Sequence, residues 1–323
     1  MSRGETIQNL IDELRSTIEE ENSAQLKDDR DLLPIINSAH KRAFEILTQL
    51  YPEPIMTFST YDVSTQLWTL PENLYQDKIV HMVWVDENER KICDCKKSSL
   101  TKFTEQQQTA YQGYPRSYVV IGRNVKFSSP PGGKLMVFYL VDLPKLVRPL
   151  ATIDEVEGTD KLYISELDAE YDPTASRTSG YLNIVDGQTG LIKGSVQVKT
   201  LGTDYIEIRS TPDRSKVLNR AIASDLTALT DDLGQSISVE ADDYLCEIAG
   251  VCVIPYDSMV AAFIKQSSIA TLKRNQGYAY DVDQQLEGQF RSDMQKAANA
   301  SRDNPITIRR TNACWNSRGW SNI

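Results

Sequence analysis

The sequence predicts an α+β protein, a helical bundle formed by N-terminal and C-terminal helices with an inserted antiparallel β-sheet and a second β-rich module. Three observations predict this class. Apolar residues recur at helical spacing near both ends of the chain. Between residues 55 and 142 the period changes to two, as in strands whose side chains alternate between two faces. A further stretch, 157–250, again carries strand and turn signals.

These patterns divide the chain into four parts. We expect a discontinuous helical domain from residues 1–54 and 255–305, an antiparallel β domain over 55–150 and an added β-rich module over 151–254. The last residues, 306–323, form a C-terminal docking tail.

Two helices are predicted near the N-terminus, joined by a polar link into a helical hairpin. The first, Thr6 to Glu21, places apolar residues three or four apart. The second begins near Asp31, which can cap it, with Pro34 in the first turn, where a missing N–H costs nothing. Tyr51 precedes a proline and ends the helix.

The β domain is clearest in residues 114–142, which predict three strands. Gly122 to Asn124 supplies turn chemistry between the first two, and Ser128 to Gly133 is the loop before the third. Upstream, Lys78 to Val85 predicts a strand, with Lys91 to Lys96 pairing back on it. The polar segment Leu100 to Gln112 predicts a short helix or a covering loop.

The second module predicts strands at 161–165, 180–185, 191–198 and 203–209, and Asp186 to Gly190 is a hairpin turn. Residues 211–232 have a more helical pattern, and 236–254 predicts a short strand pair. Two further helices follow, from Pro255 to Asn275 and from Tyr280 or Asp281 to Asn304.

Composition describes an ordinary folded protein of 323 residues, 40% hydrophobic and 25% charged. The sequence has no apolar run long enough to span a membrane and no signal peptide, so we expect synthesis in a cytoplasm. The net charge of −10 argues against a groove that binds nucleic acid tightly. It does not exclude a surface past which DNA slides, but plain solubility is the better explanation of the charge. The five scattered cysteines indicate reduced thiols rather than a zinc site.

The sequence contains none of the common catalytic or nucleotide-binding motifs, so we expect no enzyme, no metal and no cofactor. His40 lies on an apolar helix stripe, which favours a packed core histidine over a catalyst. Acidic clusters occur at 154–157, 231–232 and 240–243. Paired carboxylates can hydrolyse glycosides or bind Ca²⁺, but solvated turns explain these clusters better. A hydrolase using Glu240, Asp242 and Asp243 is kept as a weaker alternative.

The C-terminal tail mixes arginine and tryptophan outside any periodic element. A frayed terminus is one interpretation. Trp and Arg are also the residue types that anchor protein interfaces, so we favour a tail that docks on a partner subunit. The candidate interface residues are Arg309, Arg310, Trp315, Arg318 and Trp320.

The order of three sequence pieces resembles the head-to-tail connector proteins of tailed bacteriophages, also called adaptor or head-completion proteins. The first is Asp31 to His40, in which a leucine pair precedes Asn37-Ser-Ala39. The second is Leu67 to Pro71 followed by the strand 78–85. The third is Gly113 to Tyr118 with the later Gly122, Val125, Phe127, Pro130-Pro131 and Phe138-Tyr139. With the C-terminal helices, the resemblance covers about two thirds of the chain.

The resemblance implies a non-enzymatic virion protein, assembled in the host cytoplasm and located at the neck. Such proteins form a ring oligomer, usually a dodecamer, that binds the portal protein, extends the DNA channel and carries neck or tail proteins. Long helices line the channel, and the tail docks on the portal. Double-stranded DNA then passes without specific binding, repelled by acidic helix faces. The candidates for these faces are Glu13, Glu19, Glu20, Asp281, Asp283 and Glu287. The alternative is a β-rich tail or receptor-binding subunit of a phage, with residues 157–250 contacting the host.

Overall fold

The computed structural model describes the chain in two compact units. Unit 1 comprises residues 1–54 and 144–323, and unit 2 comprises residues 55–143. The residues described are 5–17, 26–52, 55–70, 74–107, 114–129, 131–169, 171–173, 180–218, 220–229, 237–277 and 282–303.

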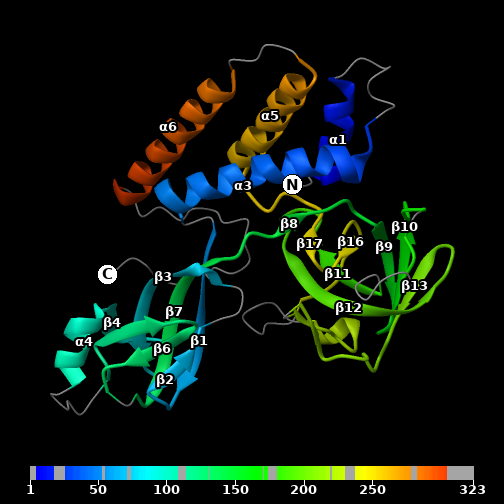
Figure 1. Cartoon of the computed structure of the whole chain (residues 1–323). Helices are drawn as coiled ribbons and strands as arrows, with labels where there is room; N and C mark the ends of the chain where they lie inside the picture. Colours follow the sequence, from blue (N-terminus) through cyan, green and yellow to red (C-terminus); the bar gives the residue numbers. More distant parts are fainter. Residues whose placement is uncertain are drawn as a thin grey trace. The chain divides into compact units, whose positions relative to one another are not determined.

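The fold is mostly β, so the prediction of a helical bundle with an inserted sheet is wrong. Unit 1 contains a closed six-stranded barrel, and unit 2 is a curled seven-stranded sheet with one short helix (Figure 1). The physical reason is that each β region buries its own apolar core. The helices therefore do not supply the core around which the β structure is inserted.

Unit 2 has the strand order β1-β7-β3-β4-β5-β6-β2. The strands are β1 (Met56–Val63), β2 (Leu67–Thr69), β3 (Leu74–Val85), β4 (Lys91–Lys97), β5 (Ser117–Ile121), β6 (Asn124–Phe127) and β7 (Gly133–Val141). The three predicted strands of 114–142 are confirmed as β5, β6 and β7. Gly122 has φ +61°, the left-handed conformation that the predicted turn requires.

The sheet of unit 2 is not wholly antiparallel, because β4 pairs with β5 in parallel. Helix α4 (Leu100–Gln107), the predicted short helix, lies between the two strands in sequence. A parallel pair needs such a crossover connection. Trp84 of β3 is fully buried in this unit, and its indole Nε1 donates a 2.7 Å hydrogen bond to the carbonyl of Pro115.

The barrel of unit 1 closes in the order β10-β13-β12-β11-β16-β9. Its strands are β9 (Ala151–Glu157), β10 (Lys161–Ser165), β11 (Tyr181–Val185), β12 (Ile192–Leu201), β13 (Tyr205–Ile208) and β16 (Tyr244–Glu247). β10 to β13 confirm the four predicted strands. Alternating apolar side chains such as Leu162, Ile184 and Leu245 fill the interior.

Two predictions for this region need correction. The described residues of 211–218 and 220–229 form only the short strands β14 (Lys216–Val217) and β15 (Arg220–Ala221) and the 3-10 turn η3 (Leu226–Ala228), because Pro212 and several Asp and Ser residues favour turns. The expected strand pair within 236–254 does not pair with itself. β16 joins the barrel, and β17 (Gly250–Val251) pairs in parallel with β8 (Lys145–Leu146).

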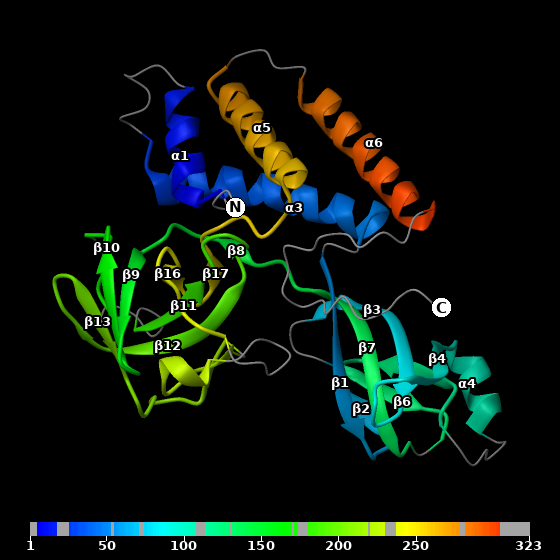
Figure 2. The same cartoon turned by 180° about the vertical axis from the view of Figure 1, so that it is seen from behind.

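The helices of unit 1 are α1 (Ile7–Ser16), the π-helical turn η1 (Asp28–Leu32), α3 (Leu33–Leu50), α5 (Ser258–Asn275) and α6 (Val282–Asp303). α5 packs on α3, α6 on α5, and α1 on α5, so that α1, α5 and α6 lie side by side along α3 (Figures 1 and 2). α1 therefore packs on a helix from the far end of the chain, in addition to the turn that precedes α3.

Two predicted helix starts shift by a few residues. Asp31 does not cap α3; its carboxylate accepts the N–H of Lys27 and closes the π-helical turn. Pro34 lies in the first turn of α3 as predicted. α5 begins after Asp257 rather than at Pro255, because the Asp257 carboxylate accepts the N–H groups of Met259 and Val260.

The attachment of α6 depends on Phe290, whose ring stacks on Phe263 with 4.2 Å between ring centroids. Phe290 is 4% exposed. We predict that Phe290→Ala weakens the docking of α6 by about 3 kcal/mol, the usual loss on truncating a buried aromatic side chain. Hydrogen exchange of α6 amides should accelerate, whereas the exposed neighbour Gln289→Ala should leave it unchanged. Equal exchange in the two variants would contradict this packing role.

Candidate functional site

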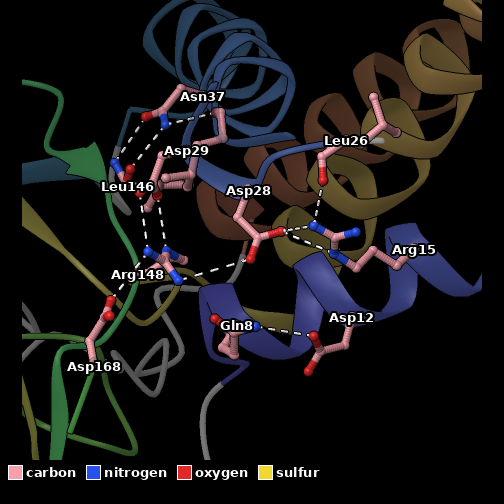
Figure 3. A network of polar contacts seen from close by, with 11 residues as sticks. Gln8, Asp12, Arg15, Leu26, Asp28, Asp29, Asn37, Leu146, Arg148 and Asp168 are labelled. Carbon is pink, nitrogen blue, oxygen red and sulfur yellow. Dashed lines mark hydrogen bonds and ion pairs between the residues drawn. The ribbon is translucent and has the colours of Figure 1, made fainter. Parts of the chain in front are cut away.

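The first candidate site is a network of charged side chains where the helices of unit 1 meet the segment after β8 (Figure 3). Arg148 lies at its centre and binds Asp29 with two hydrogen bonds, Nε to Oδ1 at 2.9 Å and Nη2 to Oδ2 at 3.1 Å. The same Nη2 lies 3.2 Å from Oδ2 of Asp168, which follows β10. Nη1 lies 3.9 Å from Oδ2 of Asp28. One guanidinium therefore contacts three carboxylates from two parts of the chain.

A second arginine extends this network to α1. Nε of Arg15 donates to Oδ1 of Asp28 at 3.0 Å, and Nη2 donates to the carbonyl of Leu26 at 2.7 Å. Asp28 thus lies between the two guanidinium groups (Figure 3). The π-helical turn is the element that presents Asp28 and Asp29 to the two arginines.

Asn37 makes the junction specific, because its side-chain amide pairs with a backbone as a neighbouring strand would. Nδ2 donates to the carbonyl of Leu146 at 2.9 Å, and Oδ1 accepts the N–H of Leu146 at 2.9 Å. Nδ2 also donates to the carbonyl of Leu33 in the preceding helical turn. α3 is thereby fixed against β8. The backbone adds a second link, since the N–H of Ile7 donates to the carbonyl of Cys252.

The electrostatics of this network favour a permanent charge. Partial burial opposes the charge of Arg148, but the hydrogen bond to Asp29 and the nearby carboxylates outweigh it and raise the pKa of Arg148 above its ordinary value. A group held in one charge state cannot exchange protons with a substrate. The chemistry available to this arrangement is therefore the binding of carboxylates, and the carboxylates it binds are those of the chain itself.

The second candidate site lies at one end of the barrel, around the buried Lys193. Its Nζ lies 2.9 Å from Oδ2 of Asp243 and 3.1 Å from Oδ2 of Asp186. The Lys193 and Asp243 side chains are 8% and 4% exposed. Burial raises the pKa of Asp243. Burial opposes the charge of Lys193 as well, but the hydrogen bond and charge of Asp243, with a smaller contribution from Asp186, outweigh it and raise the pKa of Lys193. Burial also opposes the charge of Asp186, but hydrogen bonds from Thr189 and then from Lys193 outweigh it and lower the pKa of Asp186.

The third polar centre joins α3 to the segment before α5. Nε2 of His40 lies 2.9 Å from the hydroxyl of Tyr256. Burial lowers the pKa of His40 to about 4 and raises that of Tyr256. His40 is fully buried, so the prediction of a packed, hydrogen-bonded core histidine is confirmed.

The structure describes only some of the predicted site residues. Glu13 pairs with Lys265, and Glu287 pairs with Arg291 at 2.8 Å. Glu19, Glu20, Asp281 and the side chain of Asp283 lie outside the described residues, as do the tail candidates Arg309, Arg310, Trp315, Arg318 and Trp320.

The acidic clusters differ from their predicted form. Asp243 is not solvated, because it is buried against Lys193, although Glu240 and Asp242 are exposed as expected. The cluster 154–157 lies in strand β9 rather than in a turn, and 231–232 lies outside the described residues. The predicted hairpin turn at Asp186 to Gly190 is confirmed, since it joins β11 to β12.

Sequence reasoning missed Arg148, Asp28, Asp29 and Lys193. Lys193 carried a usable signal, a lysine next to Ile192 in a strand whose neighbours are small or apolar. A buried lysine needs carboxylate partners, and Asp186 lies in the turn just before this strand, although Asp243 precedes the distant strand β16. Arg148 carried no such signal, because its partners lie more than a hundred residues away on one side.

Comparison with models of protein families found no match, and neither did comparison with curated proteins. Across the described parts of the chain, helices fall short of the length and apolar character needed to cross a bilayer. Within the same residues, no group of three or more His, Cys, Asp or Glu side chains is placed to hold a metal ion.

Because Arg148 neutralises Asp29 and Asp168, we predict that Arg148→Met destabilises unit 1 by about 2 kcal/mol, through carboxylates left with weaker partners. Lys296→Met is the matched control, since its ion pair with Asp293 is exposed and should contribute less than about 0.5 kcal/mol. Urea unfolding measures both. A loss for Arg148→Met no larger than for the control would show that the network does not stabilise the fold.

His40 predicts a pH dependence. Its pKa is about 4 in the fold and 6.5 in the unfolded chain, so the unfolded state binds the extra proton between these values. Stability contributed by neutral His40 is therefore complete above pH 6.5 and is lost as pH falls toward 4, by up to about 1.4 kcal/mol per pH unit. The difference in unfolding free energy between the wild type and His40→Gln should follow this slope. Parallel pH profiles for the two proteins would contradict it.

Proposed function

We propose that this chain is a structural virion protein of a tailed bacteriophage, a head-to-tail adaptor. Copies of it form a ring, twelvefold by resemblance, that docks under the portal, extends the DNA channel and presents a platform to neck or tail proteins. Assembly takes place in the host cytoplasm, and the protein acts through binding rather than catalysis.

The observation that carries this proposal is the role of one of the three sequence pieces whose order resembles the adaptor family. Within Asp31 to His40, Asn37 pairs with Leu146, and His40 with Tyr256. The preceding Asp28 and Asp29 bind arginines. These residues therefore have structural roles in unit 1, as expected of a segment that helps a ring subunit to keep its shape.

The polar interior of unit 1 supports a structural role as well. Arg148 and Lys193 each bind more than one carboxylate of the chain itself. Charged groups used in this way fix segments against one another. Both of them join segments distant in sequence, as expected of a subunit that must keep its shape within an assembly.

The proposal that DNA passes through the ring without binding is supported more by the net charge of the chain than by Glu13 and Glu287, the two acidic candidates whose side chains the structure describes. Glu13 and Glu287 are each paired with a cation, Lys265 and Arg291. A paired carboxylate repels phosphate weakly beyond the Debye length, about 8 Å at physiological salt. Repulsion of DNA would therefore come from the net charge of −10 summed around a ring.

A second candidate function is favoured by the β content. The closed barrel and the seven-stranded sheet exceed the β structure that the adaptor resemblance implies. A β-rich tail or receptor-binding subunit would use such domains to contact the host. Purified protein that competes with phage for adsorption to host cells would support this candidate, whereas an adaptor should not compete.

Electron microscopy of the purified chain, alone and mixed with purified portal, tests the first proposal. We expect rings, and we expect the chain in mass spectra of purified virions. A chain that stays monomeric with and without portal, and is absent from virions, would overturn the adaptor proposal.

The tail gives a separate prediction. If Trp315 or Trp320 anchors the portal contact, Trp→Ala at that position should weaken portal binding by about 2 kcal/mol, as for other buried aromatic anchors. Ser321→Ala, a small change in the same tail, is the matched control and should have little effect. Binding of a chain lacking residues 306–323 completes the series. Unchanged affinity after that deletion would exclude the tail as the portal anchor.

A further inference from the structure

The barrel places a lysine amine against two carboxylates by means of a β-bulge. In the β11–β12 pair, Ile184 lies opposite Gly194 and Val185 lies opposite Ile192, so Lys193 is the extra residue. A bulge changes the direction of a side chain relative to the regular strand. Here the Lys193 side chain is directed toward Asp243 and Asp186, with little exposure to water.

Asp243 is held by backbone donors on both carboxylate oxygens. Oδ2 accepts the N–H of Glu240 at 2.8 Å in addition to Nζ of Lys193, and Oδ1 accepts the N–H of Gly187 at 3.4 Å. Gly187 is required for this approach, since a Cβ at that position would lie 2.1 Å from the carbonyl oxygen of Asp242. N–H groups in this position can stabilise negative charge that develops on a carboxyl oxygen.

Asp186 presents one oxygen to the amine while the other is fixed. Its Oδ1 accepts the N–H of Gln188 and both the N–H and the hydroxyl of Thr189, at 2.7 to 3.0 Å. Its Oδ2 faces Nζ of Lys193. The side chain of Asp186 is 21% exposed, more than those of its two partners, so that a small molecule can leave on this side.

From this geometry we propose that Lys193 and Asp243 form an intramolecular isopeptide bond, an amide between Nζ and Cγ, with Asp186 as the proton carrier. Asp186 takes a proton from the ammonium of Lys193 and leaves a neutral amine. The amine attacks Cγ of protonated Asp243, the C–O bond breaks, and the departing oxygen leaves as water after receiving a proton. The amide and one water molecule contain all the atoms of the ammonium and carboxylate, and no oxidant, reductant or co-reactant is needed.

Two features of the site bear on the rate. Reacting groups held in contact gain a large effective concentration, and burial favours the protonated form of Asp243 that the attack requires. Lys193 keeps its proton firmly, because its two carboxylates outweigh burial. The reactive amine is therefore a minor form, and the bond forms once per molecule, slowly, after folding.

Intact-mass measurement of the denatured full chain tests the proposal without any variant. Wild-type protein, incubated after purification, should lose the mass of one water molecule. Digestion followed by tandem mass spectrometry should show the peptide containing Lys193 joined to the peptide containing Asp243. A folded wild-type chain that keeps its unmodified mass on prolonged incubation would overturn the proposal.

Three variants separate this bond from other dehydrations. Lys193→Arg keeps the charge but removes the amine, so no water should be lost; Lys199→Arg, on the same strand, should behave as wild type. Asp186→Asn should slow the reaction at least tenfold. Loss of water that persists in Lys193→Arg would point to a succinimide at Asp186-Gly187 and would overturn the isopeptide assignment.

Discussion

The architecture of unit 1 depends most on the contacts that the guanidinium of Arg148 makes with carboxylates. This guanidinium binds carboxylates from the π-helical turn before α3 and from the loop after β10, segments separated by more than a hundred residues. Planar guanidinium groups suit this role, because their donors point in fixed directions and remain charged. Asn37 adds a neutral counterpart one turn into α3, and together they set where the helices meet the strands.

The barrel also contains a cation that binds carboxylates from two segments. Asp186 and Asp243 each accept a backbone N–H within their own turn, and the Oδ2 atom of each also contacts Nζ of Lys193. The charge of Lys193 therefore links the two turns. Arg148 and Lys193 thus have the same role, because each is a cation that links segments of the chain through their carboxylates.

Local features were predictable from the sequence, and long-range ones were not. Period-two alternation located β5, β6 and β7, and helical spacing located α1, α3, α5 and α6. Closure of the barrel was not predictable, because it depends on β16 pairing with β9 across almost a hundred residues. The fold class was wrong for that reason, since a closed barrel needs no helices to cover it. The same holds for the residues of the candidate sites. The burial of His40 was predictable from the apolar helix stripe on which it lies, whereas the role of Arg148 depends on distant partners that local spacing does not reveal.

The insertion of unit 2 has a consequence for the order in which the protein forms during synthesis. The whole of unit 2 is encoded before residue 144, whereas α1 makes backbone contacts with Cys252 and packs on α5. During translation, unit 2 can fold while the N-terminal helices still lack their partners. The apolar faces of α1 and α3 therefore stay exposed until α5, which is near the end of the chain, has emerged from the ribosome. Unit 1 is thus the part of the protein for which help from a chaperone on the nascent chain would matter most.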